Sequence, residues 1–149
     1  MFNKISKIVD LKDLEVTANK LAKTISLGDV LFLCGELGSG KTTFVRYFIN
    51  GIFAIYSKSN NPKIIRSPTF NLMINYPLKN FQIYHYDLYR IKNTKEIQEL
   101  DIYENIRNNI TLIEWPEIIF KNLQITKYYK IDLKIESTNK RKIDIFLND

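Results

Sequence analysis

The chain has 149 residues, 45% of them hydrophobic and 26% charged, which are the values of an ordinary globular protein with room for one core. No apolar run is long enough to span a bilayer, so the composition excludes a membrane-spanning protein, and we expect no membrane contact. The net charge of +6 is one signature of a nucleic-acid surface. The lysines are scattered without a dense basic run, however, which favours a general compositional bias.

The single cysteine and the first segment bear on location. Cys34 has no partner for a disulfide within the chain, which fits a reducing compartment. The opening segment, MFNKISKIVDLKD, carries acidic residues and lacks a small-residue cleavage site, so it does not resemble a signal peptide. We therefore expect a cytoplasmic protein. The absence of repeats and internal linkers predicts a single domain over residues 1–149.

Taken in order, the chain alternates predicted strands and helices. Residues 2–9 form a plausible strand, and residues 10–25 repeat apolar side chains at helical spacing. Residues 30–34 are a nearly continuous apolar run, typical of a strand covered on both faces. A helix is expected over 43–50, followed by a surface loop over 51–63 that collects Ser, Asn and Pro.

The apolar run is followed by GELGSGKT, which fits the pattern G-x-x-x-x-G-K-[ST] without a mismatch. Gly35, Gly38 and Gly40 allow the backbone to curl and its amides to approach phosphates closely. Lys41 is placed to reach the β- and γ-phosphates, and the hydroxyl of Thr42 is placed to bind Mg²⁺. Because a strand precedes the loop and a helix follows it, the pattern predicts a nucleoside-triphosphate site rather than a chance glycine-rich turn.

The second half of the chain predicts further strands and a terminal hairpin. The expected elements are a short strand or the approach to one at 64–65, strands at 70–76 and 81–86 joined by a turn at 78–80, one or two short helices within 93–106, a strand at 109–113, a short helix at 117–123, and a hairpin of 128–136 and 141–147 around the turn 137–140.

Two of these strands end in acidic residues. Asp87 follows the strand 81–86, where a carboxylate that meets Mg²⁺ is required; the alternative is an N-cap for whatever follows. Glu114 follows the strand 109–113 and is expected to complete a metal shell or to polarise a water. The sole histidine, His85, is expected to be a hydrogen-bonded structural residue.

Two further residues are candidates for the same site. Thr69 belongs to a rigid Ser-Pro-Thr segment, which either holds a hydroxyl near the γ-phosphate or forms a simple turn. Trp115 directly follows Glu114 and either stacks over the site or packs in the core.

Four segments occur in this order along the chain: GELGSGKTT, SPTF, HYDLYR and IEWPE. Together they resemble the TsaE (YjeE) family, the small P-loop ATPases of bacterial tRNA threonylcarbamoyladenosine biosynthesis. The resemblance implies an α/β fold: one P-loop NTPase domain, a mixed central sheet flanked by helices and a C-terminal β-hairpin. It also implies binding and slow hydrolysis of ATP with Mg²⁺. The implied partners are TsaD-like and TsaB-like subunits, with tRNA contacted only indirectly through that complex.

The resemblance also implies roles for individual residues. Lys41, Asp87 and Glu114 would be catalytic, and Thr42, Glu114 and Asp87 would hold the metal. The nucleotide would be held by Gly35, Glu36, Leu37, Gly38, Ser39, Gly40, Lys41, Thr42, Thr43, Thr69, Trp115 and Lys140. The chain departs from the family pattern at Leu14, where relatives carry Thr near the adenine; Asp13 or Thr17 are the candidates to replace it.

Two other functions compete with this one. A small P-loop kinase would need a lid with several arginines, and the arginines here are widely spaced with no visible acceptor-binding insert. A non-catalytic nucleotide-dependent binding module would bind ATP without turnover. No side chain is an obvious strong general base, so catalysis is expected to be electrostatic and hydrolysis slow until a partner docks.

Overall fold

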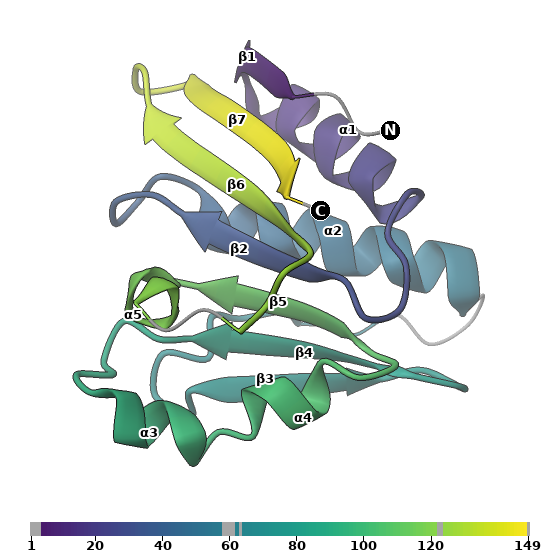
Figure 1. The fold of residues 1–149 in the computed structure, drawn as a ribbon. Coiled ribbons are helices and arrows are strands. Elements are labelled where there is room, and N and C mark those ends of the chain that lie inside the picture. Colours follow the sequence, from purple (N-terminus) through teal and green to yellow (C-terminus); the bar gives the residue numbers. More distant parts are fainter. Residues whose placement is uncertain (1–3, 58–61, 63, 122–123, 149) are drawn as a thin grey trace.

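The structure is a computed structural model that describes residues 4–57, 62, 64–121 and 124–148. Seven strands form one mixed sheet in the order β1-β7-β6-β2-β5-β4-β3 (Figure 1). The strands are β1 (Ile5–Val9), β2 (Val30–Cys34), β3 (Met73–Pro77), β4 (Gln82–Asp87), β5 (Ile110–Glu114), β6 (Tyr128–Ile135) and β7 (Arg141–Asn148). The helices are α1 (Leu11–Ala22), α2 (Lys41–Tyr56), α3 (Thr94–Gln98), α4 (Ile102–Asn105) and α5 (Glu117–Phe120).

Strand β2 is buried along its whole length because helices lie on both faces of the sheet. Leu31 and Leu33 pack into the core under α1 and α2, while Val30 and Phe32 point into a second core under the short helices. Figure 1 shows α1 and α2 on one side of the sheet and α3, α4 and α5 on the other. The predicted α/β fold, with a mixed sheet flanked by helices and a terminal hairpin of β6 and β7, is confirmed.

Four neighbouring strands, β6, β2, β5 and β4, run parallel, and the outer strands β1, β7 and β3 run antiparallel to their neighbours. Parallel strands place their carboxyl ends at one edge of the sheet. At that edge Asp87 of β4 is the register partner of Glu114 of β5, and Glu114 is in turn the partner of Leu33 of β2. The predicted carboxylates therefore lie side by side next to the glycine-rich loop.

Helix α2 continues to Tyr56, so the loop that the sequence predicted from Gly51 onward is wrong for residues 51–56. Ile52 and Phe53 are buried and extend the apolar face of the helix. Gly51 is itself buried where α2 crosses α1: a Cβ there would lie 2.7 Å from Oδ1 of Asn19 and 3.0 Å from Cβ of Ala22. This glycine is therefore a site of close helix packing and does not end the helix.

Replacing Gly51 by Leu should lower the free energy of unfolding by about 1 to 3 kcal/mol, because the added side chain must push α1 away from α2. Urea unfolding followed by circular dichroism measures the change. Ala54→Leu is the matched control, since Ala54 is exposed on the same helix. Equal stability of the two variants would contradict the close packing.

Other boundaries shift for local reasons. No strand forms at 64–65, and β3 begins only at Met73, because residues 70–72 turn and Leu72 adopts a left-handed φ of 63°. Helix α1 ends at Ala22 and not at 25, and α5 ends at Phe120. The expected ends of the first strand and of the 117–123 helix include residues 2–3 and 122–123, which lie outside the described residues. Among the described residues, no helix combines the length and apolarity that crossing a membrane requires.

Candidate functional site

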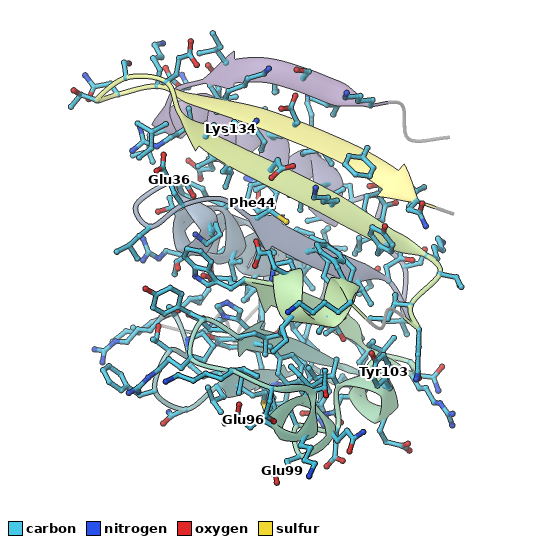
Figure 2. The ribbon with its side chains drawn as sticks, turned by 60° about the vertical axis from the view of Figure 1, so that its left-hand side comes forward. Glu36, Phe44, Glu96, Glu99, Tyr103 and Lys134 are labelled. Carbon is cyan, nitrogen blue, oxygen red and sulfur yellow. The ribbon has the colours of Figure 1, made fainter. Side chains whose placement is uncertain are left out.

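The glycine-rich loop turns tightly between β2 and α2, and Figure 2 shows Glu36 on this loop and Phe44 on the helix that follows. Gly35 approaches β6 so closely that a Cβ would lie 2.5 Å from the carbonyl oxygen of Leu133. Gly40 is the N-cap of α2 with a φ of 104°, a conformation that other residues rarely adopt. The loop therefore needs glycine at both positions, and it leaves the N-terminus of α2 facing the site.

Lys41 is buried at the start of α2. Its Nζ donates hydrogen bonds to the carbonyl oxygens of Gly35, at 2.7 Å, and Glu36, at 3.0 Å, and lies 4.0 Å from the centre of the Trp115 ring. Burial lowers the pKa of Lys41 below its usual value of 10.5, against the pull of nearby Glu114. The ammonium is thus held in a partly dehydrated place, where an anionic ligand would be attracted strongly.

Glu114 is buried at the end of β5 and is held from two sides. The hydroxyl of Thr42 donates to its oxygens, at 3.1 Å from Oε1 and 3.3 Å from Oε2. The Nε2 atom of His85 lies 2.9 Å from Oε1. The carboxylate therefore links the start of α2 to the neighbouring strand β4.

Asp87 is buried at the end of β4 and binds the Ser-Pro-Thr segment. Its Oδ2 accepts hydrogen bonds from the hydroxyls of Ser67, at 2.6 Å, and Thr69, at 2.9 Å. Its Oδ1 accepts from the backbone N–H of Tyr89 at 3.0 Å. No helix begins at Asp87, since α3 starts only at Thr94, but the carboxylate does cap the turn that follows through its contact with the Tyr89 N–H.

These groups surround one cavity of about 360 Å³ at the carboxyl edge of the parallel strands. Its lining residues are Leu37, Gly38, Gly40, Lys41, Thr42, Thr43, Ser67, Thr69, Asp87, Tyr89, Glu114 and Trp115. The structure thus brings most of the predicted site residues together. Gly35 and Glu36 reach the site through their carbonyl contacts with Lys41, whereas the Ser39 side chain is buried within the loop.

Trp115 lies at the rim of this cavity and not in the core. Its backbone has a φ of 56°, which turns the chain sharply after β5. Besides its contact with Lys41, its ring lies 4.8 Å from the ring of Tyr89, measured between centroids. Trp115 therefore lines the site, and its stacking over a bound ligand stays a prediction.

A second cavity, of about 570 Å³, shares Gly38, Gly40 and Thr43 with the first and extends toward the start of α1 and the terminal hairpin. It is lined by Val9, Asp10, Leu11, Lys12, Leu14, Gly38, Gly40, Thr43, Thr138, Asn139 and Arg141. Asp13 and Thr17 are not part of this lining, and the Thr17 hydroxyl is buried and bonded to the carbonyl oxygen of Asp13 at 2.6 Å. Neither residue lines this cavity, so their contact with the base stays a prediction.

The terminal hairpin reaches the loop through a residue that sequence reasoning missed. Nη2 of Arg141 lies 3.3 Å from the carbonyl oxygen of Gly38, and its Nη1 donates to the carbonyl oxygens of Ser137 and Lys140. Lys140 is exposed in the turn next to the cavity, outside the lining. Only the position of Arg141, directly after the turn, could have indicated this contact.

The donor atoms suit a hard cation. The described part of the chain contains no group of three or more His, Cys, Asp or Glu side chains that could hold a metal ion by themselves. Mg²⁺ does not need one, because it commonly binds one or two carboxylates together with the phosphates of its substrate. The carboxylate oxygens of Glu114 and Asp87, which are buried, and the hydroxyl of half-buried Thr42 lie at one cavity and fit that requirement.

Comparison with known proteins agrees with this geometry. The sequence model of the family "Threonylcarbamoyl adenosine biosynthesis protein TsaE" matches residues 8–143. The tRNA threonylcarbamoyladenosine biosynthesis protein TsaE of Rickettsia conorii is 44% identical over 131 residues, covering 88% of this chain and 71% of that protein. The protein of the same name from Aquifex aeolicus is 33% identical, covering 87% and 85%.

A solved structure shares the fold. The crystal structure of YdiB from Bacillus subtilis superposes with a TM-score of 0.73 at 26% sequence identity, covering 99% of this chain and 87% of that one. The family match extends over most of the chain and includes both strand-end carboxylates and the glycine-rich loop. The chain therefore belongs to the TsaE family of tRNA threonylcarbamoyladenosine biosynthesis proteins.

Proposed function

We propose that this protein is a Mg²⁺-dependent ATP-binding and ATP-hydrolysing subunit that supports tRNA N6-threonylcarbamoyladenosine modification through a TsaD–TsaB complex in the cytoplasm. The observation that carries the proposal is the convergence of Lys41, Thr42, Asp87 and Glu114 on one cavity at the end of a glycine-rich loop. A phosphate chain needs many donors, a cation and metal-binding oxygens at short range, and this cavity supplies all three.

The arrangement of the two cavities supports binding of a whole nucleotide. Both cavities are lined by Gly38, Gly40 and Thr43, so they adjoin at the loop. The triphosphate would occupy the cavity with Lys41. The base would occupy the larger cavity, where Leu11 and Leu14 offer an apolar surface to its ring.

The metal would be held by Thr42, Glu114 and Asp87, and its charge would offset negative charge that develops on the phosphate oxygens. Lys41 would leave the carbonyl oxygens that it now contacts and bind the β- and γ-phosphates. Ser67 and Thr69, which hold Asp87, would keep that carboxylate aimed into the cavity. The sole histidine is buried against Glu114 and is not free to act as a general base, which supports slow hydrolysis by the isolated chain.

Exposed apolar side chains around the cavity support a protein partner. Leu37 is 78% exposed, Phe70 is 84% exposed and Tyr89 is 59% exposed, and all three belong to loops at this edge of the sheet. Large apolar side chains in water at the mouth of a site are typical of an interaction surface. We propose that the TsaD–TsaB pair docks there and completes the site.

The test measures ATP turnover by the isolated protein and by the protein with its TsaD-like and TsaB-like partners. We expect slow, Mg²⁺-dependent turnover that rises when both partners are added, with labelled γ-phosphate released only as free phosphate. Label transferred to another acceptor would instead show a kinase. Binding without turnover in any mixture would show a nucleotide-dependent binding module.

Arg141 offers a separate prediction about the nucleotide. Arg141→Ala should weaken ADP binding by about 3- to 10-fold, because the guanidinium contacts the loop and lines the larger cavity. Lys140→Ala tests the predicted lysine contact, and we expect the smaller effect because Lys140 lies outside that lining. Calorimetric titration of both variants with ADP compares them; a larger loss with Lys140→Ala would contradict this order.

A further inference from the structure

His85 is the sole histidine of the chain and is fully buried. Its ring contacts the site only through Glu114 among the interactions described above. Alternate residues of a strand share a face, so His85 points to the same side of β4 as Asp87. Glu114 is the register partner of Asp87 on β5 and lies diagonally across from His85. The imidazole therefore lies on the same face of the sheet as the two carboxylates, two residues before the carboxyl end of β4.

The contacts of the ring define which nitrogen carries the proton. Nε2 of His85 lies 2.9 Å from Oε1 of Glu114, and an ionised carboxylate can only accept. This contact favours the tautomer that carries its hydrogen on Nε2. Nδ1 is buried without a hydrogen-bond partner among the described residues. An N–H at Nδ1 would be a buried donor with no acceptor, so the tautomer with its hydrogen on Nε2 fits this place.

The Glu114 carboxylate is consequently fixed on both sides. Nε2 of His85 contacts Oε1, and the Thr42 hydroxyl lies 3.1 Å from Oε1 and 3.3 Å from Oε2. Glu114 and Thr42 line the cavity of about 360 Å³, whereas His85 does not. Any effect of His85 on a bound ligand must therefore pass through Glu114.

We propose that His85 is a positioning residue that orients the Glu114 carboxylate for Mg²⁺ by donating the Nε2 hydrogen to Oε1. This inference rests on the proposed function, because it assumes that Glu114 binds the metal. Hydrogen bonds to a ligating carboxylate fix its orientation, and removing them typically weakens metal affinity by about 10- to 100-fold. Bare nucleotide would depend on the loop and Lys41 instead, so His85 should have little influence on it.

The test is calorimetric titration with ADP at a series of Mg²⁺ concentrations and in EDTA. His85→Ala should raise the Mg²⁺ concentration for half-maximal strengthening of ADP binding by about 10-fold or more, with affinity in EDTA unchanged. His85→Gln should restore a value within about 3-fold of the wild type, because its amide nitrogen reaches the position of Nε2. His85→Asn is the matched control, since its shorter side chain cannot reach Oε1.

The outcomes separate this inference from the function on which it rests. Wild-type binding that ignores Mg²⁺ overturns both. A Mg²⁺-dependent wild type with an unchanged requirement in His85→Ala overturns the role of His85 alone, as does equal behaviour of the Gln and Asn variants. If His85→Ala fails to fold, the comparison of Gln with Asn decides.

A second readout needs neither metal nor turnover. Because the chain has one histidine, nitrogen NMR of a tag-free sample gives a single pair of imidazole signals. We expect Nε2 protonated and Nδ1 unprotonated in the metal-free protein. Protonation at Nδ1 alone would place the donor on the wrong side of the ring and overturn the proposal.

Discussion

Replacing Lys41 by Met is expected to lower ATP turnover by about 100-fold or more while the protein stays folded. Met fills the space of the lysine stem but carries no charge for the β- and γ-phosphates. Turnover should be measured with and without the TsaD-like and TsaB-like partners, together with urea unfolding of the same samples. Lys20→Met is the matched control, because Lys20 is exposed on α1. Turnover that survives in Lys41→Met would contradict the proposed site.

The same variant should also differ from the wild type in how its free energy of unfolding depends on pH. Burial keeps the pKa of Lys41 below its usual 10.5, so the folded chain holds this proton less tightly than the unfolded chain. At neutral pH the charged Lys41 therefore lowers the free energy of unfolding of the wild type. This destabilisation decreases as the pH rises through the folded-state pKa toward 10.5. Lys41→Met lacks that destabilisation, and its advantage in free energy of unfolding should shrink over the same alkaline range.

Replacing Glu114 by Gln is expected to remove most of the Mg²⁺ dependence and to lower turnover by about 100-fold, a loss of roughly 3 kcal/mol. The amide oxygen can still accept from His85, so the buried contact at 2.9 Å has a substitute and the fold should persist. The charge and one oxygen are lost, however, and the NH₂ group faces a metal that needs oxygen ligands.

The measurement for this variant is ADP affinity with and without Mg²⁺, alongside turnover. Glu117→Gln is the matched control, because Glu117 carries the same charge and is exposed at the start of α5, three residues further on. We expect the control to bind and turn over nucleotide as the wild type does. If Glu114→Gln kept the full Mg²⁺ effect, the carboxylate could not be a metal ligand.

The sequence predicted the site best where chemistry requires a residue type at a fixed place in a motif. The glycine-rich loop, with Lys41 and Thr42, follows from such a pattern. Asp87 and Glu114 follow from a second rule, since each ends an apolar strand and the ends of parallel strands meet at one edge. Local sequence and sheet geometry agreed there, and the carboxylates lie next to the loop as expected.

Features set by contacts between distant segments were less predictable. Gly51 resembles a helix stop in the sequence, but it is used for close packing against Asn19 and Ala22. Arg141 reaches Gly38 only because the terminal hairpin folds over the loop, and no motif marks that approach. The pairing of Ser67 with Asp87 depends in the same way on how the Ser-Pro-Thr segment folds back.

The position of Trp115 gives the protein an optical reporter of its own site. It is the only tryptophan in the chain, and its ring lies 4.0 Å from Nζ of Lys41. A ligand that draws the ammonium away from the indole alters the electric field at the chromophore, so intrinsic emission should change as the phosphate chain arrives. Stopped-flow mixing can then follow nucleotide entry in the unlabelled protein, one signal arising from one place.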